Sequence, residues 1–268
     1  MPTAADLGND DLRVTGSDDG LVVRATIDRP EKRNALNDAV LDGLAAVFDY
    51  ADDSPTRVVV LRGAGGTFCA GGDLQSMAES FGRDAQAFRE GFGTLAGLME
   101  RMVDTGALVV AAVEGYCLAG GMGLAASCDV ILAGEDATFG TPEVDIGLLP
   151  AQAMVPIMRT VSEKQGLKLL FTGERIDAAR ADEIGFTSEV VPSDDFDAEL
   201  DDLVDDLAAS SPVMIEMGKE AFYNQREMGF AEALSYGREI ISLVAMSEET
   251  EAGIEAFLAG EEPEWRGR

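Results

Sequence analysis

The chain has 268 residues, of which 46% are hydrophobic, so it can bury the core of one large domain, with or without a helical appendage. Its 50 Asp and Glu residues against 20 Lys and Arg give a net charge of −30, which argues against binding to nucleic acid or anionic lipid because like charges repel. The sequence contains no histidine, which excludes Ser-His-Asp and Cys-His catalysis and leaves carboxylates, Tyr, Cys or Lys for acid–base chemistry.

Strands and helices alternate over the first two thirds of the chain. A glycine-rich loop at 64–74 follows a short apolar segment. The order of the elements indicates an α/β core with parallel strand pairing. The pattern predicts strands at 21–27, 57–62, 108–113 and 129–133, a helix capped by Asn37, a long helix from Asp84 and a short helix at 120–127.

After about residue 194 the pattern is helical only. We place a boundary near Val191-Pro192, which divides the chain into an α/β core at 1–192 and a helical region at 193–268. The helical region is short for an independent domain, so we expect it to pack on its own core or on a neighbouring subunit. Helical spacing covers residues 195–209, 212–226, 230–246 and 248–258.

The chain shows no targeting or membrane-spanning signal. The first twelve residues hold no basic region followed by an apolar run, so no signal peptide is expected and the protein is expected to be cytoplasmic. The most apolar stretch, 106–126, contains Glu114 and five glycines, which argues against a membrane span. The cysteines at 69, 117 and 128 are odd in number and lie among apolar residues, so we expect core thiols rather than disulfides.

Two glycine-rich segments follow apolar strands, at 68–74 (FCAGGDL) and 118–124 (LAGGMGL). Small residues let backbone N–H groups face an open site, and two such groups can form an oxyanion hole. The second segment opens a helix, whose N-terminus favours negative charge. On composition alone, the same glycines are also explained by tight turns and close strand–helix packing.

A third segment, 139–150 (FGTPEVDIGLLP), holds Glu143 among apolar and small residues. Burial in such surroundings disfavours the charged form of a carboxyl group and suits it to proton transfer near neutral pH. The alternative is an ordinary solvated glutamate. The sequence has no phosphate-binding GxxxxGK[ST] motif and no cluster of Cys, Asp or Glu with metal-site spacing, so no metal or redox cofactor is expected.

Taken together, these segments resemble the crotonase superfamily, that is, the enoyl-CoA hydratase/isomerase family. The likeness covers about residues 20 to 260, and both the order and the spacing of the motifs agree. It implies a crotonase-like α/β spiral of ββα units with a C-terminal helical region that forms trimer contacts, in a homotrimer or a hexamer. The matching stretches are DRPEKRNAL (28–36), GTFCAGGDL (66–74), the segment 113–150, and FTGERIDAARADEIGFTSEVVP (171–192).

The resemblance also implies roles for individual residues. Backbone N–H groups of Ala70 and Gly120 would hold the thioester oxygen of an acyl-CoA substrate as an enolate forms. Glu143 would be the catalytic acid–base residue. Gly71, Gly72 and Asp73 would line the acyl-CoA path with Ala70, and Asp73 would fix the loop as a hydrogen-bond acceptor.

One position departs from the family pattern. The hydratases of the family carry a second catalytic glutamate three residues after the oxyanion glycine, and this chain has Gly123 there. Hydration by paired carboxylates is therefore in doubt, whereas an isomerase can work with the single Glu143. If the backbone at 123 is helical, a glutamate there is expected to fit.

Coenzyme A is polyanionic and meets a chain of net charge −30. Arg29, Lys32 and Arg33 form the nearest basic cluster to a matching loop and are candidates to offset the phosphates, with ordinary surface charge as the alternative. Only four of the basic residues are lysines, and the acids spread along the whole chain. This pattern resembles proteins from salt-saturated cytoplasm more than one acidic partner-binding face.

The resemblance thus implies an enoyl-CoA hydratase or isomerase that acts through a stabilised thioester enolate, with coenzyme A present only as part of the substrate. Two alternatives stay open. One is a non-catalytic crotonase homologue that binds acyl-CoA, which the glycine at 123 motivates. The other is a thioester hydrolase or C–C lyase on the same fold.

Overall fold

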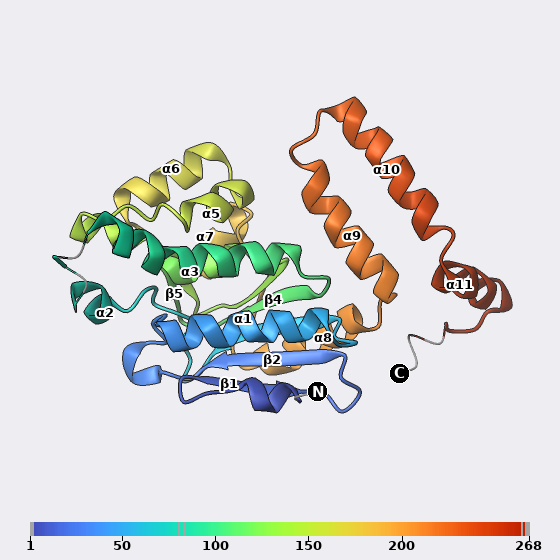
Figure 1. The fold of residues 1–268 in the computed structure, drawn as a ribbon, viewed down its shortest axis with the longest axis horizontal. Helices are drawn as coiled ribbons and strands as arrows, with labels where there is room; N and C mark the ends of the chain where they lie inside the picture. The colour runs from blue at the N-terminus through green and yellow to red at the C-terminus, as the bar shows by residue number, and fades with distance from the viewer. Residues whose placement is uncertain (1–2, 80, 83, 264, 266–268) are drawn as a thin grey trace.

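The computed structural model describes residues 3–79, 81–82, 84–263 and 265 (Figure 1). Within them, a six-stranded sheet has the order β1-β2-β3-β4-β6-β9. β1 pairs with β2 antiparallel and the remaining neighbours are parallel, which confirms the parallel pairing expected of the apolar segments. The strands are β1 (Leu12–Gly16), β2 (Val22–Ile27), β3 (Val58–Gly63), β4 (Leu108–Val113), β6 (Val130–Gly134) and β9 (Glu189–Val191).

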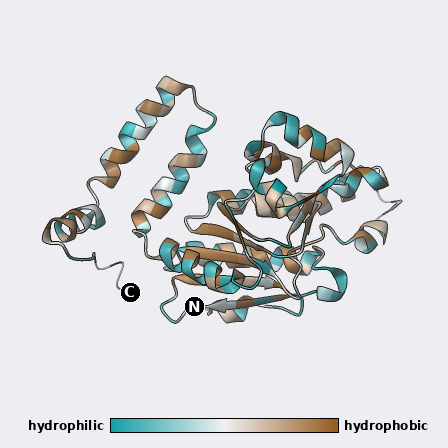
Figure 2. Cartoon of the chain, turned by 180° about the vertical axis from the view of Figure 1, so that it is seen from behind, coloured by the Kyte–Doolittle hydropathy of each residue, from teal (hydrophilic) through white to brown (hydrophobic). Residues whose placement is uncertain are grey.

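The large sheet is buried on both faces. Side chains alternate along each strand, so Val59 and Leu61 of β3 join the larger apolar cluster while Val58 and Val60 join a second one. Helices α1 (Asp38–Asp52) and α3 (Ala85–Asp104) pack on the side of the larger cluster (Figure 1), and α8 (Phe196–Ala208) packs on the other side. The strands are correspondingly hydrophobic in Figure 2.

A smaller sheet of three strands lies beside the large one in the described part of the chain. It consists of β5 (Tyr116–Leu118), β7 (Thr138–Gly140) and β8 (Arg175–Asp177). β5 and β7 run parallel, so their carboxyl ends meet at one edge. β8 joins β7 antiparallel. This edge is where the glycine-rich segment after β5 and the segment that carries Glu143 both begin.

The remaining elements are short helices around the small sheet and a helical arm. None of the helices in the described residues is both long and apolar enough to cross a membrane. The short helices are α2 (Leu74–Glu79), α4 (Gly120–Ala126), α5 (Met154–Thr160), α6 (Glu163–Thr172) and α7 (Ala178–Glu183), with 3₁₀ turns at Ala4–Leu7, Pro30–Lys32 and Pro142–Ile146. The arm consists of α9 (Pro212–Gln225), α10 (Phe230–Val244) and α11 (Glu248–Ala259).

The helical arm projects from the core (Figure 1). α9 is anchored by Lys219, whose Nζ lies 2.8 Å from the carboxylate of Asp129 and donates to the carbonyls of Met102 and Ala107. α10 packs against α9, but neither α10 nor α11 has a buried residue. The helices expected after residue 194 are therefore present. The first of them, α8, belongs to the core packing, and the role of the arm in a trimer stays a prediction.

Candidate active site

Three backbone segments run side by side and end at one place. A parallel bridge aligns Cys69 with Cys117, and the pairing of β5 with β7 aligns Cys117 with Phe139. Each segment continues into one of the regions that the sequence singled out, with Gly72, Gly120 and Glu143 three or four residues further on. The sheet register thus collects both glycine-rich segments and the buried glutamate at one edge.

Gly120 offers a free backbone donor. It is the first residue of α4, so its N–H has no partner within the helix. No acceptor for this N–H lies among the described residues. The preceding residue, Ala119, is fixed by a 2.8 Å hydrogen bond from its N–H to Gly140 O and has a φ of +55°, which is costly for a non-glycine residue. Such strain is typical of functional sites.

The other glycine-rich segment presents Gly72 rather than Ala70. The N–H of Ala70 donates to Arg33 O at 3.0 Å, so it is already engaged, contrary to its expected role as an oxyanion donor. The carbonyl of Gly71 accepts from Leu36 N, and the trans peptide turns the N–H of Gly72 the opposite way. This N–H has no acceptor in the described part of the chain.

The two free N–H groups are neighbours. The nitrogen of Gly72 lies 3.8 Å from the point that a Cβ on Gly120 would occupy. A sequence motif alone does not reveal which amide of AGGD is free, because the answer depends on the bridge between Leu36 and Gly72. Glycine is required at position 71 for the two glycine-rich segments to lie this close. The φ of Gly71 is +102°, and a Cβ there would lie 2.5 Å from Cβ of Ala119.

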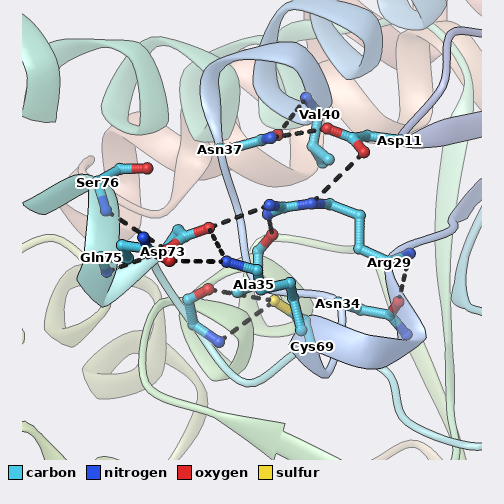
Figure 3. Close-up of polar contacts among 12 residues, drawn as sticks. Asp11, Arg29, Asn34, Ala35, Asn37, Val40, Cys69, Asp73, Gln75 and Ser76 are labelled. Carbon is cyan, nitrogen blue, oxygen red and sulfur yellow. Dashed lines mark hydrogen bonds and ion pairs between the residues drawn. The ribbon is translucent and has the colours of Figure 1, made fainter.

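Asp73 and Arg29 form a buried structural pair behind the loop (Figure 3). Arg29 Nη2 lies 3.0 Å from Asp73 Oδ2, and the guanidinium also contacts Asp11 and the carbonyl of Ala35. Burial acts to raise the pKa of Asp73, but the hydrogen bonds it accepts outweigh this effect and the pKa is lowered. Asp73 therefore fixes the loop, as expected, whereas Arg29 is only 8% exposed and is not placed to meet coenzyme A phosphates.

Other cations near the glycine-rich loop remain accessible to solvent. Lys32 is exposed, with its Nζ 3.1 Å from Gln75 Oε1 and 3.9 Å from Asp73. Arg33 is exposed and lies over the ring of Tyr116, 6.0 Å from its centroid. Arg175 approaches the same ring at 5.9 Å. No sequence motif points to Arg175, because the pairing of β7 with β8 is what brings it here.

Glu143 is a partly buried carboxyl group with an unsatisfied atom. It lies in the 3₁₀ turn at Pro142–Ile146, which is closed by a hydrogen bond from Leu148 N to Glu143 O. Its Oε2 is buried and has no hydrogen-bond partner among the described residues. Burial raises the pKa of Glu143 above its ordinary value. Both features agree with the tuning that the sequence suggested, and both suit a group that exchanges protons with a bound substrate.

The space beside Gly123 is occupied by protein. A Cβ at position 123 would lie 2.6 Å from both Cα and Cβ of Ala153 and 3.0 Å from Cε of Met99. The expectation that a glutamate fits here is therefore wrong, because backbone atoms of the residue just before α5 stand where its side chain would begin. Ala153, in the segment that follows Pro150, therefore fills the second carboxylate position.

This packing predicts an unusual cost for Gly123→Ala. Replacing a helical glycine with alanine normally adds about 0.5–1 kcal/mol of stability, whereas we expect Gly123→Ala to lower the unfolding free energy by about 1–3 kcal/mol through overpacking. Urea unfolding measures the change. Gly97→Ala in α3 is the matched control, since a Cβ there meets nothing within 4 Å. Equal effects of the two substitutions contradict the tight contact with Ala153.

Known proteins are similar to this chain in both sequence and fold. A model of the enoyl-CoA hydratase/isomerase family matches residues 18–268. The 2,3-dehydroadipyl-CoA hydratase of Escherichia coli (strain K12) is 35% identical over 249 residues, which is 92% of this chain and 96% of that protein. The human mitochondrial enoyl-CoA hydratase domain-containing protein 3 is 34% identical over 89% of this chain and 78% of its own length.

Among solved structures, an enoyl-CoA hydratase of Mycobacterium smegmatis matches with a TM-score of 0.91 at 30% identity and covers 96% of this chain and 99% of its own. The fold is that of the crotonases, an α/β core with a C-terminal helical region, as the motifs implied. The chain belongs to the enoyl-CoA hydratase/isomerase family. The halophilic origin and the oligomeric state stay predictions.

Proposed function

We propose that this protein is an acyl-CoA enzyme in which Gly72 and Gly120 hold the thioester oxygen and Glu143 moves the proton. The observation that carries the proposal is a pair of neighbouring N–H groups that have no acceptor among the described residues. They lie at the same sheet edge as a buried carboxyl oxygen that also has no hydrogen-bond partner in that part of the chain. Hydrogen-bond donors of this kind stabilise negative charge on the thioester oxygen as a proton leaves the adjacent carbon. Gly72 takes the role that the family resemblance implied for Ala70.

The reaction that this site supports best is double-bond isomerisation. Glu143 removes a proton from C2 of a 3-enoyl-CoA, the electron pair moves to the thioester oxygen as a dienolate, and the same carboxyl returns the proton to C4. The product is the 2-enoyl-CoA, and no water is consumed. Ala153 occupies the position of a second, water-orienting carboxylate, which favours this reaction over hydration.

Hydration is the second candidate, because relatives such as the Escherichia coli protein are named hydratases. Parallel assays with a 3-enoyl-CoA and with crotonyl-CoA separate the two. We expect double-bond shift to be the faster reaction. Faster formation of 3-hydroxyacyl-CoA contradicts isomerisation as the main activity. Free coenzyme A as the main product indicates a hydrolase, and binding without turnover of either thioester indicates a non-catalytic acyl-CoA-binding homologue.

Coenzyme A phosphates need cations on a strongly acidic surface. Lys32 and Arg33 are the accessible candidates from the expected basic cluster, and Arg175 joins them at Tyr116. Neither Arg33 nor Arg175 has a carboxylate partner within 4.0 Å among the described residues. Coenzyme A enters as part of the substrate, and the proposed chemistry uses no further cofactor.

The helical arm is proposed to form contacts between subunits of a trimer or of a hexamer made from two trimers. Its exposed apolar side chains, such as Phe230, Met246 and Phe257, are more than 80% accessible in the single chain. Burial of such side chains between subunits is favourable at about 25 cal/mol per Å². The core that binds acyl-CoA and the arm that assembles the subunits would then be distinct parts of one cytoplasmic protein.

Assembly is expected to depend on salt. Each subunit carries a net charge of −30, and the screening length grows from about 3 Å in 1 M salt to about 10 Å in 0.1 M salt. We therefore expect a folded oligomer in about 3 M KCl and dissociation or unfolding in about 0.1 M KCl. Light scattering and circular dichroism report the two changes. The same folded oligomer in both buffers contradicts the adaptation to high salt.

A further inference from the structure

A buried thiol lies behind the segment that carries the free N–H of Gly72. The Sγ atom of Cys69 accepts a hydrogen bond from the N–H of Gly71 at 3.4 Å, and it lies 3.9 Å from the carbonyl oxygen of the same residue (Figure 3). Cys69 is 0% exposed, so its thiol does not line the open site. It contacts instead the residue directly before the donor Gly72.

The same side chain packs against the other donor segment. A Cβ on Gly121 would lie 2.8 Å from Cβ of Cys69 and 2.9 Å from its Sγ. A glycine at position 121 therefore lets the first turn of α4 lie directly on the thiol. Because Gly121 follows the donor Gly120, the thiol of Cys69 touches the chain neighbour of each donor.

The glycine-rich loop needs a contact of this kind because it contains two consecutive glycines. Peptide units beside glycine have more accessible orientations than those beside other residues. The carbonyl of Gly71 accepts from Leu36 N at 2.8 Å, and the N–H of Gly71 is held by the thiol of Cys69. Both peptide units that meet at Gly71 are thus fixed, and the second of them carries the N–H of Gly72.

The thiol also suits this place by its charge. Burial raises the pKa of Cys69 to about 12, so the side chain is neutral at physiological pH. An anionic side chain at the same position would repel the negative charge that develops on the thioester oxygen. Sulfur is a weak hydrogen-bond acceptor, but a buried N–H without any acceptor is less stable still.

We propose that Cys69 is a positioning residue for the reaction, whose thiol fixes Gly71 so that the N–H of Gly72 points at the thioester oxygen beside the N–H of Gly120. This inference rests on the proposed function and adds to it a residue that touches neither the substrate nor the reacting atoms. Loss of the thiol leaves the N–H of Gly72 present but less well directed. The effect on turnover should therefore be smaller than the roughly 10²–10³-fold cost of losing a donor.

Two substitutions at position 69 test the role in turnover of a 3-enoyl-CoA. We expect Cys69→Ala to lower kcat about tenfold with little change in KM, because alanine has no acceptor for the N–H of Gly71. Cys69→Ser supplies a hydroxyl oxygen as acceptor and should keep kcat within about threefold of wild type. Cys128→Ala is the matched control, since it removes another buried thiol, which donates to Leu124 O at 3.5 Å, and should leave kcat unchanged.

A double-mutant cycle separates positioning of the Gly72 donor from a general structural effect. In the Gly72→Pro background the donor is already absent, so adding Cys69→Ala should lower kcat further by less than about twofold. A loss of stability that acts elsewhere in the site would lower kcat by the same factor in both backgrounds. Equal factors in the two backgrounds therefore overturn the inference.

The carbonyl stretch of bound butyryl-CoA, labelled with ¹³C at the thioester carbon, reports the same contact without turnover. Hydrogen bonds to the oxygen weaken the C=O bond, so isotope-edited infrared spectra should show a lower frequency for the bound than for the free thioester. Part of this lowering should be lost in Cys69→Ala and kept in Cys69→Ser and Cys128→Ala.

The outcomes distinguish the inference from the function on which it rests. Wild-type kcat and wild-type carbonyl frequency in a folded Cys69→Ala variant overturn the role of the thiol, while turnover by the wild type leaves the proposed function intact. An unshifted carbonyl frequency in the wild type overturns both, because the two amides then do not hold the thioester oxygen.

Discussion

Replacing Glu143 with glutamine is expected to lower turnover of a 3-enoyl-CoA about 10²–10⁴-fold, the range for the loss of a positioned general acid–base group. Glutamine keeps the size of the side chain and removes the proton that the mechanism moves. Affinity for a saturated acyl-CoA should stay close to that of the wild type, because the two N–H donors are unchanged. Steady-state kinetics and calorimetry measure the two effects separately.

A neighbouring carboxylate supplies the control for this substitution. Asp145 lies two residues further along in the same 3₁₀ turn and is exposed. Asp145→Asn removes one negative charge from the same turn, so we expect turnover within about threefold of wild type, as for a surface charge that makes no contact with the reacting atoms. Glu143→Gln and Asp145→Asn variants with equal activity would contradict the assignment of Glu143.

The pH dependence follows from the burial of Glu143. The group must be ionised to accept a proton from C2, and burial raises its pKa above the ordinary value of 4.5. Activity on the acid side should therefore rise as the pH rises through this raised pKa, at higher pH than an exposed glutamate would give. The rise should disappear in Glu143→Gln. An acid limb at the ordinary value indicates a solvated carboxyl group.

Replacing Gly72 with proline is expected to lower turnover about 10²–10³-fold, as for the loss of one oxyanion donor. Proline has no N–H, and its ring occupies the space toward the thioester oxygen. Gly72→Ala is the matched control because it keeps the N–H, and a Cβ at this position meets nothing within 4 Å. The rate of Gly72→Ala should remain within about tenfold of wild type, and the ratio between the variants isolates the donor.

The effect expected of Ala70→Pro is on stability, whereas the effect expected of Gly72→Pro is on turnover. The N–H of Ala70 bonds to Arg33 O, so its removal costs a hydrogen bond that fixes the loop, about 0.5–1.5 kcal/mol of stability. Circular dichroism and thermal unfolding confirm that each compared variant is folded. A folded Gly72→Pro variant with the activity of Gly72→Ala would contradict the assignment of the donor to Gly72.

The four central strands of the large sheet were predictable because their signal is local. The apolar runs at 21–27, 57–62, 108–113 and 129–133 correspond to β2, β3, β4 and β6. Asn37 does cap α1, since its Oδ1 accepts from Val40 N. β1 was not predicted. It pairs only at the sheet edge, and its charged and polar residues are exposed, so it lacks a continuous apolar run.

The site was predictable in its composition but not in its detailed geometry. Glu143 stands out in the sequence because its neighbours are apolar or small, and the structure leaves its carboxyl partly buried. Arg29 looks like a surface cation in the sequence. Its burial depends on Asp11 and Asp73, which are 18 and 44 residues away along the chain. Partners at such separations carry no local signal.

The sequence by itself determined the family, the α/β core, the helical tail and the candidate acid–base residue, because each rests on local periodicity or on motifs in a fixed order. Only the tertiary structure decided which amide is free and what fills the second carboxylate position. The free amide depends on the bridge between Leu36 and Gly72, and the filled position depends on the approach of Ala153 to Gly123. Both are contacts between segments about 30 or more residues apart, whose direction is set by packing rather than by the identity of the glycine.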